Sequence, residues 1–135
     1  MFLNRLKQEN KEKFLEICMF AALANDEFED EEKEYIYAYC KEMELNVHIP
    51  DVSNQSLENV LGFLNHNTDR KEKNIIILET LGLLYCDGVY DDIERQFMNR
   101  LVKGLGITEA YYQKVEDLLK RYLTLCGEMG DVISM

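Results

Sequence analysis

The sequence contains an internal repeat. Residues 62 positions apart carry the same kind of side chain, so that NDEFEDEE at 25–32 corresponds to DGVYDDIE at 87–94. The apolar positions agree at the same offset: Tyr35, Ile36, Tyr39, Cys40 and Met43 correspond to Phe97, Met98, Leu101, Val102 and Leu105. Both sets follow the i, i+1, i+4, i+5, i+8 spacing of one face of an amphipathic helix. Two related halves are therefore predicted.

Each half is predicted to form three helices. The expected ranges are 10–24, 30–44 and 54–65, then 69–86, 92–105 and 109–126. Pro50 falls in the link after the second helix, and Thr108 is placed to cap the sixth. The first and fourth ranges are apolar nearly all round, so they are expected to cross at the centre. The predicted fold is all-α: one compact helical bundle over residues 1–135, with pseudo-two-fold symmetry between repeats at about 10–65 and 72–127.

The composition indicates a soluble globular protein, with 47% hydrophobic and 30% charged residues. A net charge of −11 argues against nucleic acids and anionic lipid as ligands, and favours cations or a protein partner with a basic surface. The apolar stretches are shorter than the roughly 20 residues that span a bilayer, so no membrane insertion is expected. The start MFLNRLKQENKEKF lacks a signal-peptide core, which predicts a cytoplasmic location.

Motifs for enzymatic chemistry are missing from the sequence. Neither His48 nor His66 has a glutamate three residues earlier, as a di-iron bundle would require. Gly-rich phosphate loops, nucleophile elbows and His-Glu-x-x-His are absent too. Glu79 lies within an apolar run and is interpreted as a satisfied polar residue near a helix interface. Four cysteines stand apart among apolar residues and are predicted to be reduced core thiols: Cys18, Cys40, Cys86 and Cys126.

The two acidic segments allow two interpretations. In the first, Asp91 and Glu94 form a capping box that stabilises a helix start, by about 1 kcal/mol for the cap alone. In the second, carboxylates crowded into two short segments relieve their repulsion by binding a divalent cation such as Ca²⁺, Mg²⁺ or Mn²⁺, or a basic partner. The predicted metal ligands are Asp87, Asp91, Glu94, Asn25, Asp26, Glu29 and Glu32. An EF-hand is excluded, since Asp30 and Ile36 stand where its loop needs glycine and glutamate.

The second segment resembles a motif of the TerB-like tellurite-resistance family: an apolar helix, Asp-Gly, an aromatic residue, an acidic residue, and Glu seven after the first Asp. YCDGVYDDIERQFM carries this pattern, and LKQENKEKFLEICMFAALANDEFEDEEKEYI resembles the family's N-terminal half. The resemblance implies an all-α domain with two related halves, an acidic metal-binding cluster and a role in bacterial stress response or tellurite resistance. The first segment departs from the pattern, with Asn25 in place of Asp and Asp26 in place of Gly.

Two functions are therefore predicted. The leading hypothesis is a non-enzymatic domain that binds a divalent cation or a basic partner through its acidic segments. The alternative is a structural protein–protein interaction adaptor whose carboxylates serve as helix caps. Its recognition groove would be lined by tyrosines such as Tyr35, Tyr37, Tyr111 and Tyr112. The tail GEMGDVISM shows no clear period and is expected either to be disordered or to dock on a neighbour.

Overall fold

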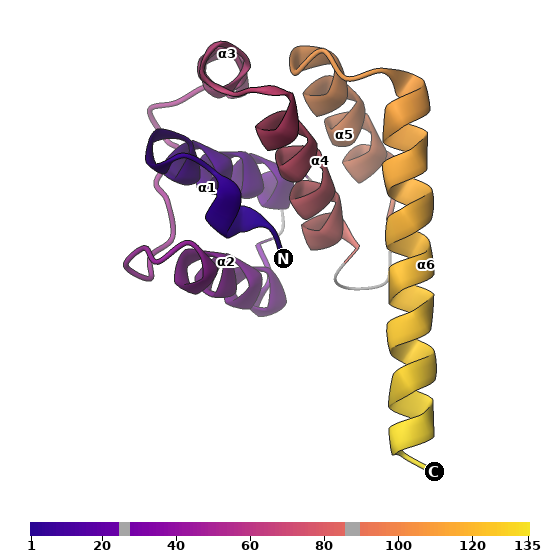
Figure 1. The fold of residues 1–135 in the computed structure, drawn as a ribbon. Coiled ribbons are helices and arrows are strands. Elements are labelled where there is room, and N and C mark those ends of the chain that lie inside the picture. The colour runs from indigo at the N-terminus through magenta and orange to yellow at the C-terminus, as the bar shows by residue number, and fades with distance from the viewer. Residues whose placement is uncertain (25–27, 86–89) are drawn as a thin grey trace.

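The computed structural model describes residues 1–24, 28–85 and 90–135. Within these ranges the regular structure is helical, with a short 3₁₀ helix η1 and six α-helices arranged as a bundle (Figure 1). The bounds are η1 Leu3–Arg5, α1 Gln8–Leu23, α2 Asp30–Glu42, α3 Leu57–Asn67, α4 Arg70–Leu84, α5 Asp92–Gly104 and α6 Glu109–Ile133. The predicted all-α class and the helix order are confirmed.

Side-chain caps account for where α3, α4 and α6 begin. Ser56 and Thr108 accept hydrogen bonds from the backbone N–H groups three residues on, at the starts of α3 and α6. At α4, Asp69 accepts from Glu72 N–H at 2.8 Å, and the Glu72 side chain accepts in return from Asp69 N–H. The third helix therefore begins a few residues later than the sequence predicted, because Ser56 is its cap.

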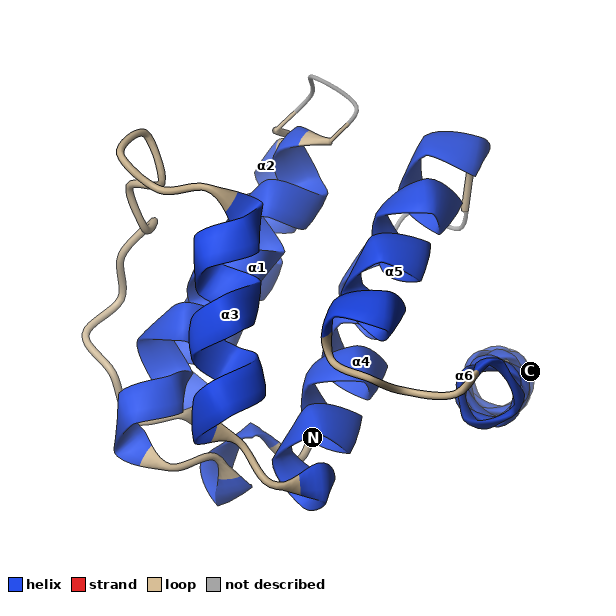
Figure 2. Ribbon diagram, turned by 90° about the horizontal axis from the view of Figure 1, so that it is seen from above, coloured by secondary structure: helices blue, strands red, loops and turns tan. Residues whose placement is uncertain are grey.

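The centre of the bundle is formed by α1 and α4, as predicted. Helix α1 packs against α2, α3 and α4, while α4 also packs against α5 and α6 (Figure 2). Both helices are buried on several sides, which requires apolar side chains nearly all round. The core side chains include Phe14, Leu15 and Ile17 from α1 and Ile76, Ile77 and Leu81 from α4, all with no exposed surface.

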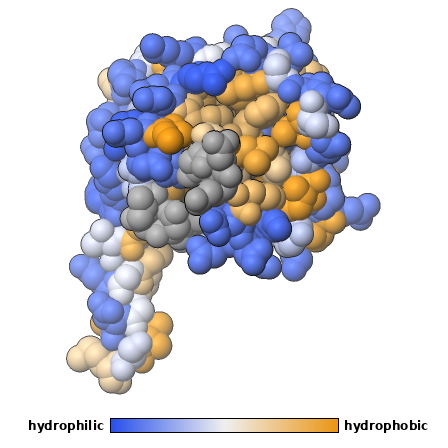
Figure 3. All heavy atoms as spheres, turned by 180° about the vertical axis from the view of Figure 1, so that it is seen from behind, coloured by the Kyte–Doolittle hydropathy of each residue, from blue (hydrophilic) through white to orange (hydrophobic). Residues whose placement is uncertain are grey.

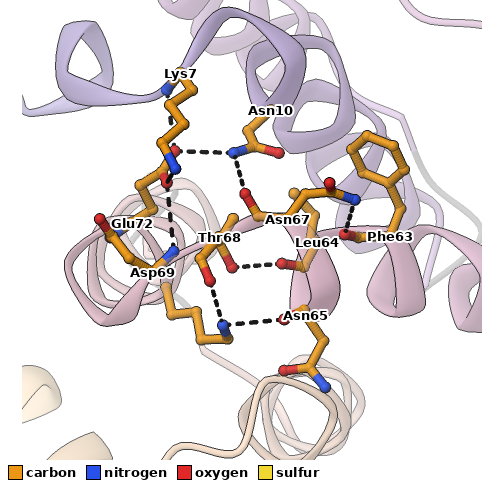
Figure 4. A network of polar contacts seen from close by, with 10 residues as sticks. Lys7, Asn10, Phe63, Leu64, Asn65, Asn67, Thr68, Asp69 and Glu72 are labelled. Atoms are coloured by element: carbon orange, nitrogen blue, oxygen red, sulfur yellow. Dashed lines mark hydrogen bonds and ion pairs between the residues drawn. The ribbon is translucent and has the colours of Figure 1, made fainter.

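A polar network joins the start of α1 to the turn between α3 and α4 (Figure 4). Glu72, only 3% exposed, accepts hydrogen bonds from Lys7 N–H at 3.0 Å and from the Asn10 side chain at 2.9 Å. The Asn10 amide also donates to the Asn67 carbonyl at 3.0 Å. One buried carboxylate therefore satisfies backbone and side-chain donors from α4 and from the start of α1.

Helices α2 and α5 end in the same way. In each, the residue after the last turn has a positive φ: 60° at Glu44 and 67° at Gly106. The backbone hydrogen bonds match as well, Leu45 N–H to the Cys40 carbonyl and Ile107 N–H to the Val102 carbonyl. The third helices differ, since α3 has 11 residues and α6 has 25.

Glu44→Gly is expected to raise the free energy of unfolding by about 1 kcal/mol, because a left-handed backbone is strained for any residue with a Cβ. The reciprocal change, Gly106→Ala, is expected to lower it by about the same amount. Chemical denaturation of both variants measures the effects. Glu44→Ala serves as the control, since it removes the side chain without relieving the backbone. If Glu44→Ala raised the free energy of unfolding as much as Glu44→Gly, strain in the left-handed backbone could not be the reason.

Helix α6 is longer than the sequence predicted. It continues to Ile133, so the prediction that it ends near residue 126 is wrong, as is the option of a disordered tail. The physical reason is that the tail lacks proline, and its apolar residues continue the helical spacing past Gly127 and Gly130. The end of α6 extends beyond the rest of the bundle (Figure 1). None of the described helices is long and apolar enough to cross a membrane.

Candidate binding groove and acidic helix starts

The acidic residues at the start of α5 are engaged in helix capping. Asp91 accepts a hydrogen bond from Glu94 N–H at 2.8 Å, and Glu94 accepts from Asp91 N–H at 3.1 Å. Glu94 is only 6% exposed. At the start of α2, Glu32 accepts from Glu29 N–H at 3.1 Å. The capping interpretation is thus confirmed for the box at Asp91 and Glu94.

The structure describes only some of the predicted metal ligands. Glu29, Glu32, Asp91 and Glu94 lie at the two helix starts, whereas the other three fall outside the described residues: Asn25, Asp26 and Asp87. Within residues 1–24, 28–85 and 90–135, no three His, Cys, Asp or Glu side chains are grouped as metal ligands would be. The capping hydrogen bonds already engage carboxylate oxygens that a cation would need as ligands.

A groove lies between the end of α1, the start of α3 and α5, with both polar and apolar side chains in its lining. Its polar lining comprises Ser56, Glu58, Gln96 and Arg100. Its apolar lining comprises Phe20, Leu23, Ala24, Leu57, Ile93 and Phe97. Leu23 and Ile93 are 42% and 48% exposed, so both are open to solvent. An ion pair between Arg100 and Glu58 crosses from α5 to α3 at the groove. Hydrophobic side chains form a broad patch on the back face of the molecule (Figure 3).

Acidic side chains border this groove. Ile93 lies in the first turn of α5 between Asp92 and Glu94, so the groove and the acidic helix start share the same turn. The starts of α2 and α5 lie on the same side of the domain (Figure 2). The first turn of α2 contributes Asp30 and Glu31, which are exposed like Asp92. Negative charge from the first turn of α5 therefore borders the groove, and the acidic start of α2 lies on the same side of the domain.

A buried polar cluster that the sequence analysis missed lies between α5 and α6. Tyr112 donates to the Glu116 carboxylate at 3.1 Å, and the hydroxyls of Tyr90 and Tyr112 are 2.8 Å apart. Glu116, 3% exposed, also pairs with Arg95 and Lys120, each at 3.4 Å. Burial raises the pKa of Tyr90 to about 12, and burial with the Tyr90 hydrogen bond raises the pKa of Tyr112 further. The hydroxyls therefore stay protonated, and the cluster fixes α6 beside the second acidic segment.

The only signal for this cluster in the sequence is the spacing of Tyr112, Glu116 and Lys120 at i, i+4 and i+8 of one helix. The tyrosine groove of the adaptor hypothesis is wrong in one member, because Tyr112 is 4% exposed and lies in the cluster. Tyr111 instead lines a separate hollow between η1, α4 and α6.

The remaining ionisable residues singled out by the sequence have structural contacts. Glu79, 5% exposed, accepts from the α-amino group of Met1 and from Phe2 N–H, each at 2.8 Å, which confirms a satisfied polar residue at a helix interface. His48 lies 2.9 Å from a Glu12 oxygen, and this hydrogen bond raises the pKa of the imidazole.

Two of the cysteines are core thiols as predicted. Cys18 and Cys40 are buried, and burial raises the pKa of both thiols. Cys126 is partly exposed on α6, and Cys86 lies outside the described residues. A buried thiol with a raised pKa is a poor nucleophile and metal ligand, so the described cysteines agree with packing roles at Cys18 and Cys40.

Comparison of the chain with protein-family models, with curated proteins and with solved structures finds no match.

Proposed function

We propose that this chain is a TerB-like, non-enzymatic binding domain that holds a basic amphipathic segment of a partner protein in the groove between α1, α3 and α5. The observation that carries the proposal is the position of Ile93, an apolar residue that lines the groove from within the acidic first turn of α5. Such a site offers apolar contact from Phe20, Leu23 and Ile93 and negative charge from the neighbouring acids of α5. A helix with an apolar face and lysine or arginine beside that face matches both properties.

The charge of the whole chain supports the same choice of partner. A net charge of −11 attracts a basic segment at long range and repels nucleic acid and anionic membrane. The exposed acids Asp30, Glu31 and Asp92 are not the N-caps of their helices, which are Glu29 and Asp91. Their carboxylates can therefore bind a ligand without loss of the caps, although Asp30 would exchange its exposed ion pair with Lys33, at 3.8 Å, for the ligand.

A direct binding assay tests the proposal. The probe is a fluorescent synthetic helical peptide with leucines at i, i+3, i+4 and i+7 and lysines elsewhere, and its control carries glutamate for each lysine. Only the basic peptide is expected to raise the fluorescence anisotropy on titration with the protein. Neutralising three acids together, Asp30→Asn, Glu31→Gln and Asp92→Asn, is expected to weaken binding about tenfold or more and to reduce its salt dependence.

Two further variants distinguish the effect of the groove on affinity from the effect of overall charge. Ile93→Ser is expected to lower the affinity for the basic peptide by about tenfold, because it removes exposed apolar surface at the groove. The matched control neutralises three acids elsewhere, Glu9→Gln, Glu109→Gln and Asp117→Asn. Its affinity is expected to stay within about twofold of the wild type once the effect of the lower net charge, which both triple variants share, is subtracted. Equal losses from both triple variants would mean that binding follows overall charge, and the groove would have no role.

Divalent cation binding, the other form of the acidic-segment hypothesis, is tested separately by calorimetry. Chelator-treated protein is titrated with Ca²⁺, Mg²⁺ and Mn²⁺, and the titration is repeated with Asp87→Asn and Asp92→Asn, which leave the box at Asp91 and Glu94 intact. Heat that disappears in this variant would assign a cation site to the second segment. Absence of heat with every ion would leave the basic peptide as the sole ligand class of the acidic segments.

The proposed setting follows from the family resemblance. We infer a cytoplasmic role in a bacterial stress-response or tellurite-resistance system, with the two halves derived from one duplicated unit related by a pseudo-two-fold axis. The matching ends of α2 and α5 support the duplication, because Glu44 and Gly106 stand 62 positions apart with the same backbone conformation. Loss of tellurite resistance on deletion, restored by the wild-type chain but not by the groove variant, would support this setting.

A further inference from the structure

Helix α6 carries an apolar stripe with the spacing of a coiled coil. Its members are separated alternately by four and three residues: Tyr111, Val115, Leu118, Tyr122, Leu125, Met129 and Val132. This is the heptad pattern in which every second member takes position a and the others position d. Val115 is only 7% exposed and lines the hollow between η1, α4 and α6. The later members are open, with Leu125 53%, Met129 50% and Val132 67% exposed.

The projecting part of α6 is little covered by the rest of the described chain. Residues from Leu123 onward are mostly exposed, and two glycines, Gly127 and Gly130, each weaken a helix by about 1 kcal/mol relative to alanine. An isolated helical end of this length is marginal in water. An exposed apolar stripe on such an end indicates that packing against a second helix stabilises it.

We propose that α6 pairs with α6 of a second copy of this chain in an antiparallel coiled coil, with the projecting end of each helix lying on the base of the other. In an antiparallel pair, an a position faces a d position of the partner helix. Val115 then faces Leu125 of the second copy, and Leu118 faces Tyr122. Every a and d residue from Tyr111 to Met129 has an apolar counterpart in this register, so the seam is dry along both helices.

Charge decides between the antiparallel and the parallel arrangement. In the antiparallel register the flanking g positions face each other, which places Lys114 opposite Glu128 of the second copy, twice by symmetry. Arg121 meets its own copy near the axis, where its exposed side chain turns to solvent. In the parallel register, each g residue would face an uncharged one: Leu119, Cys126 or Ile133. Charge complementarity is thus found only in the antiparallel pair.

The base of α6 offers room for the second helix. A hollow of about 370 Å³ lies beside the first half of α6, and its lining includes Phe2, Ile75 and Leu78 together with the stripe residues Tyr111, Val115, Leu118 and Tyr122. The antiparallel register brings Leu125 and Met129 of the second copy to this hollow. The stripe and the hollow therefore form one continuous apolar surface that two copies cover mutually.

Light scattering and sedimentation of the full chain over a range of concentrations test the proposal. The wild type is expected to be a dimer that dissociates on dilution. Leu125→Ser combined with Met129→Ser is expected to weaken the dimer at least about 100-fold, because it removes two large apolar side chains from the seam. Circular dichroism and thermal unfolding are expected to show an intact bundle, since both side chains lie outside the core.

A matched control and a charge exchange make the test specific. Leu123→Ser, 40% exposed but off the stripe, is expected to leave the dimer unchanged. Lys114→Glu and Glu128→Lys are each expected to weaken self-association, and an equimolar mixture of the two is expected to form heterodimers. A wild type that is monomeric at every concentration would overturn the proposal. So would a loss of dimer affinity in Leu123→Ser as large as that in the double variant. Heterodimers no more abundant than homodimers would overturn the antiparallel register.

Discussion

Phe14→Ala is expected to lower the free energy of unfolding by about 3–5 kcal/mol, the range for removing a buried aromatic side chain. Phe14 has no exposed surface and lies in α1, one of the two central helices. Its ring packs against Tyr39 of α2, with centroids 5.5 Å apart. Truncation therefore leaves a cavity at the junction of α1 and α2. Urea denaturation monitored by circular dichroism measures the loss.

The control for this variant is Phe14→Leu, which keeps most of the apolar volume and is expected to cost markedly less. A second comparison is Phe63→Ala, at a ring that is only partly buried, where a smaller loss is expected. If Phe14→Ala and Phe63→Ala cost the same, the assignment of α1 as a central helix would have to be reconsidered.

Glu72→Ala is expected to lower the free energy of unfolding by about 3 kcal/mol at neutral pH. The change removes the acceptor of Lys7 N–H and the Asn10 amide, together with half of the capping box at the start of α4. A buried donor left without a partner costs about 1–3 kcal/mol, and loss of the cap adds to it. Chemical denaturation measures the change. Glu9→Ala, another first-turn acid but exposed, is expected to change the stability by less than about 0.5 kcal/mol.

The same residue predicts a pH dependence. Burial alone would raise the pKa of Glu72, but the hydrogen bonds from Lys7, Asn10 and Asp69 and the charge of Lys7 outweigh it and hold the pKa below its ordinary value of 4.5. A carboxylate with a lowered pKa in the folded state stabilises the fold above its unfolded pKa and loses this contribution as pH falls through its folded pKa.

Glu72→Gln tests the charge of this side chain alone, because glutamine keeps nearly the same shape. At neutral pH this variant is expected to be less stable than the wild type, because the amide carries no charge to accept these bonds as strongly. As the pH falls from about 4.5 through the lower pKa of the folded state, the wild-type carboxylate protonates and the stability difference is expected to shrink. A difference that stays constant from neutral to acidic pH would contradict the role assigned to the ionised carboxylate.

The sequence by itself determined the helical class, the helix order and the central pair, because these depend on apolar periodicity along single helices. The box at Asp91 and Glu94 was also predictable, since a cap is formed by residues three apart in the chain. Such features need only local spacing. The predicted start of α3 is a few residues too early, because the helix begins at the Ser56 cap and the polar link before it stays non-helical.

Only the tertiary structure decided the features that depend on residues far apart in the chain. Leu23 and Ile93 are 70 positions apart, and only packing brings their side chains to one groove. Glu116 lies on α6 among exposed neighbours, and contact with Arg95 of α5 and with Tyr112 buries it. The sequence specifies which face of each helix is apolar. The geometry between helices decides whether that face enters the core, lines a groove or remains open at the end of α6.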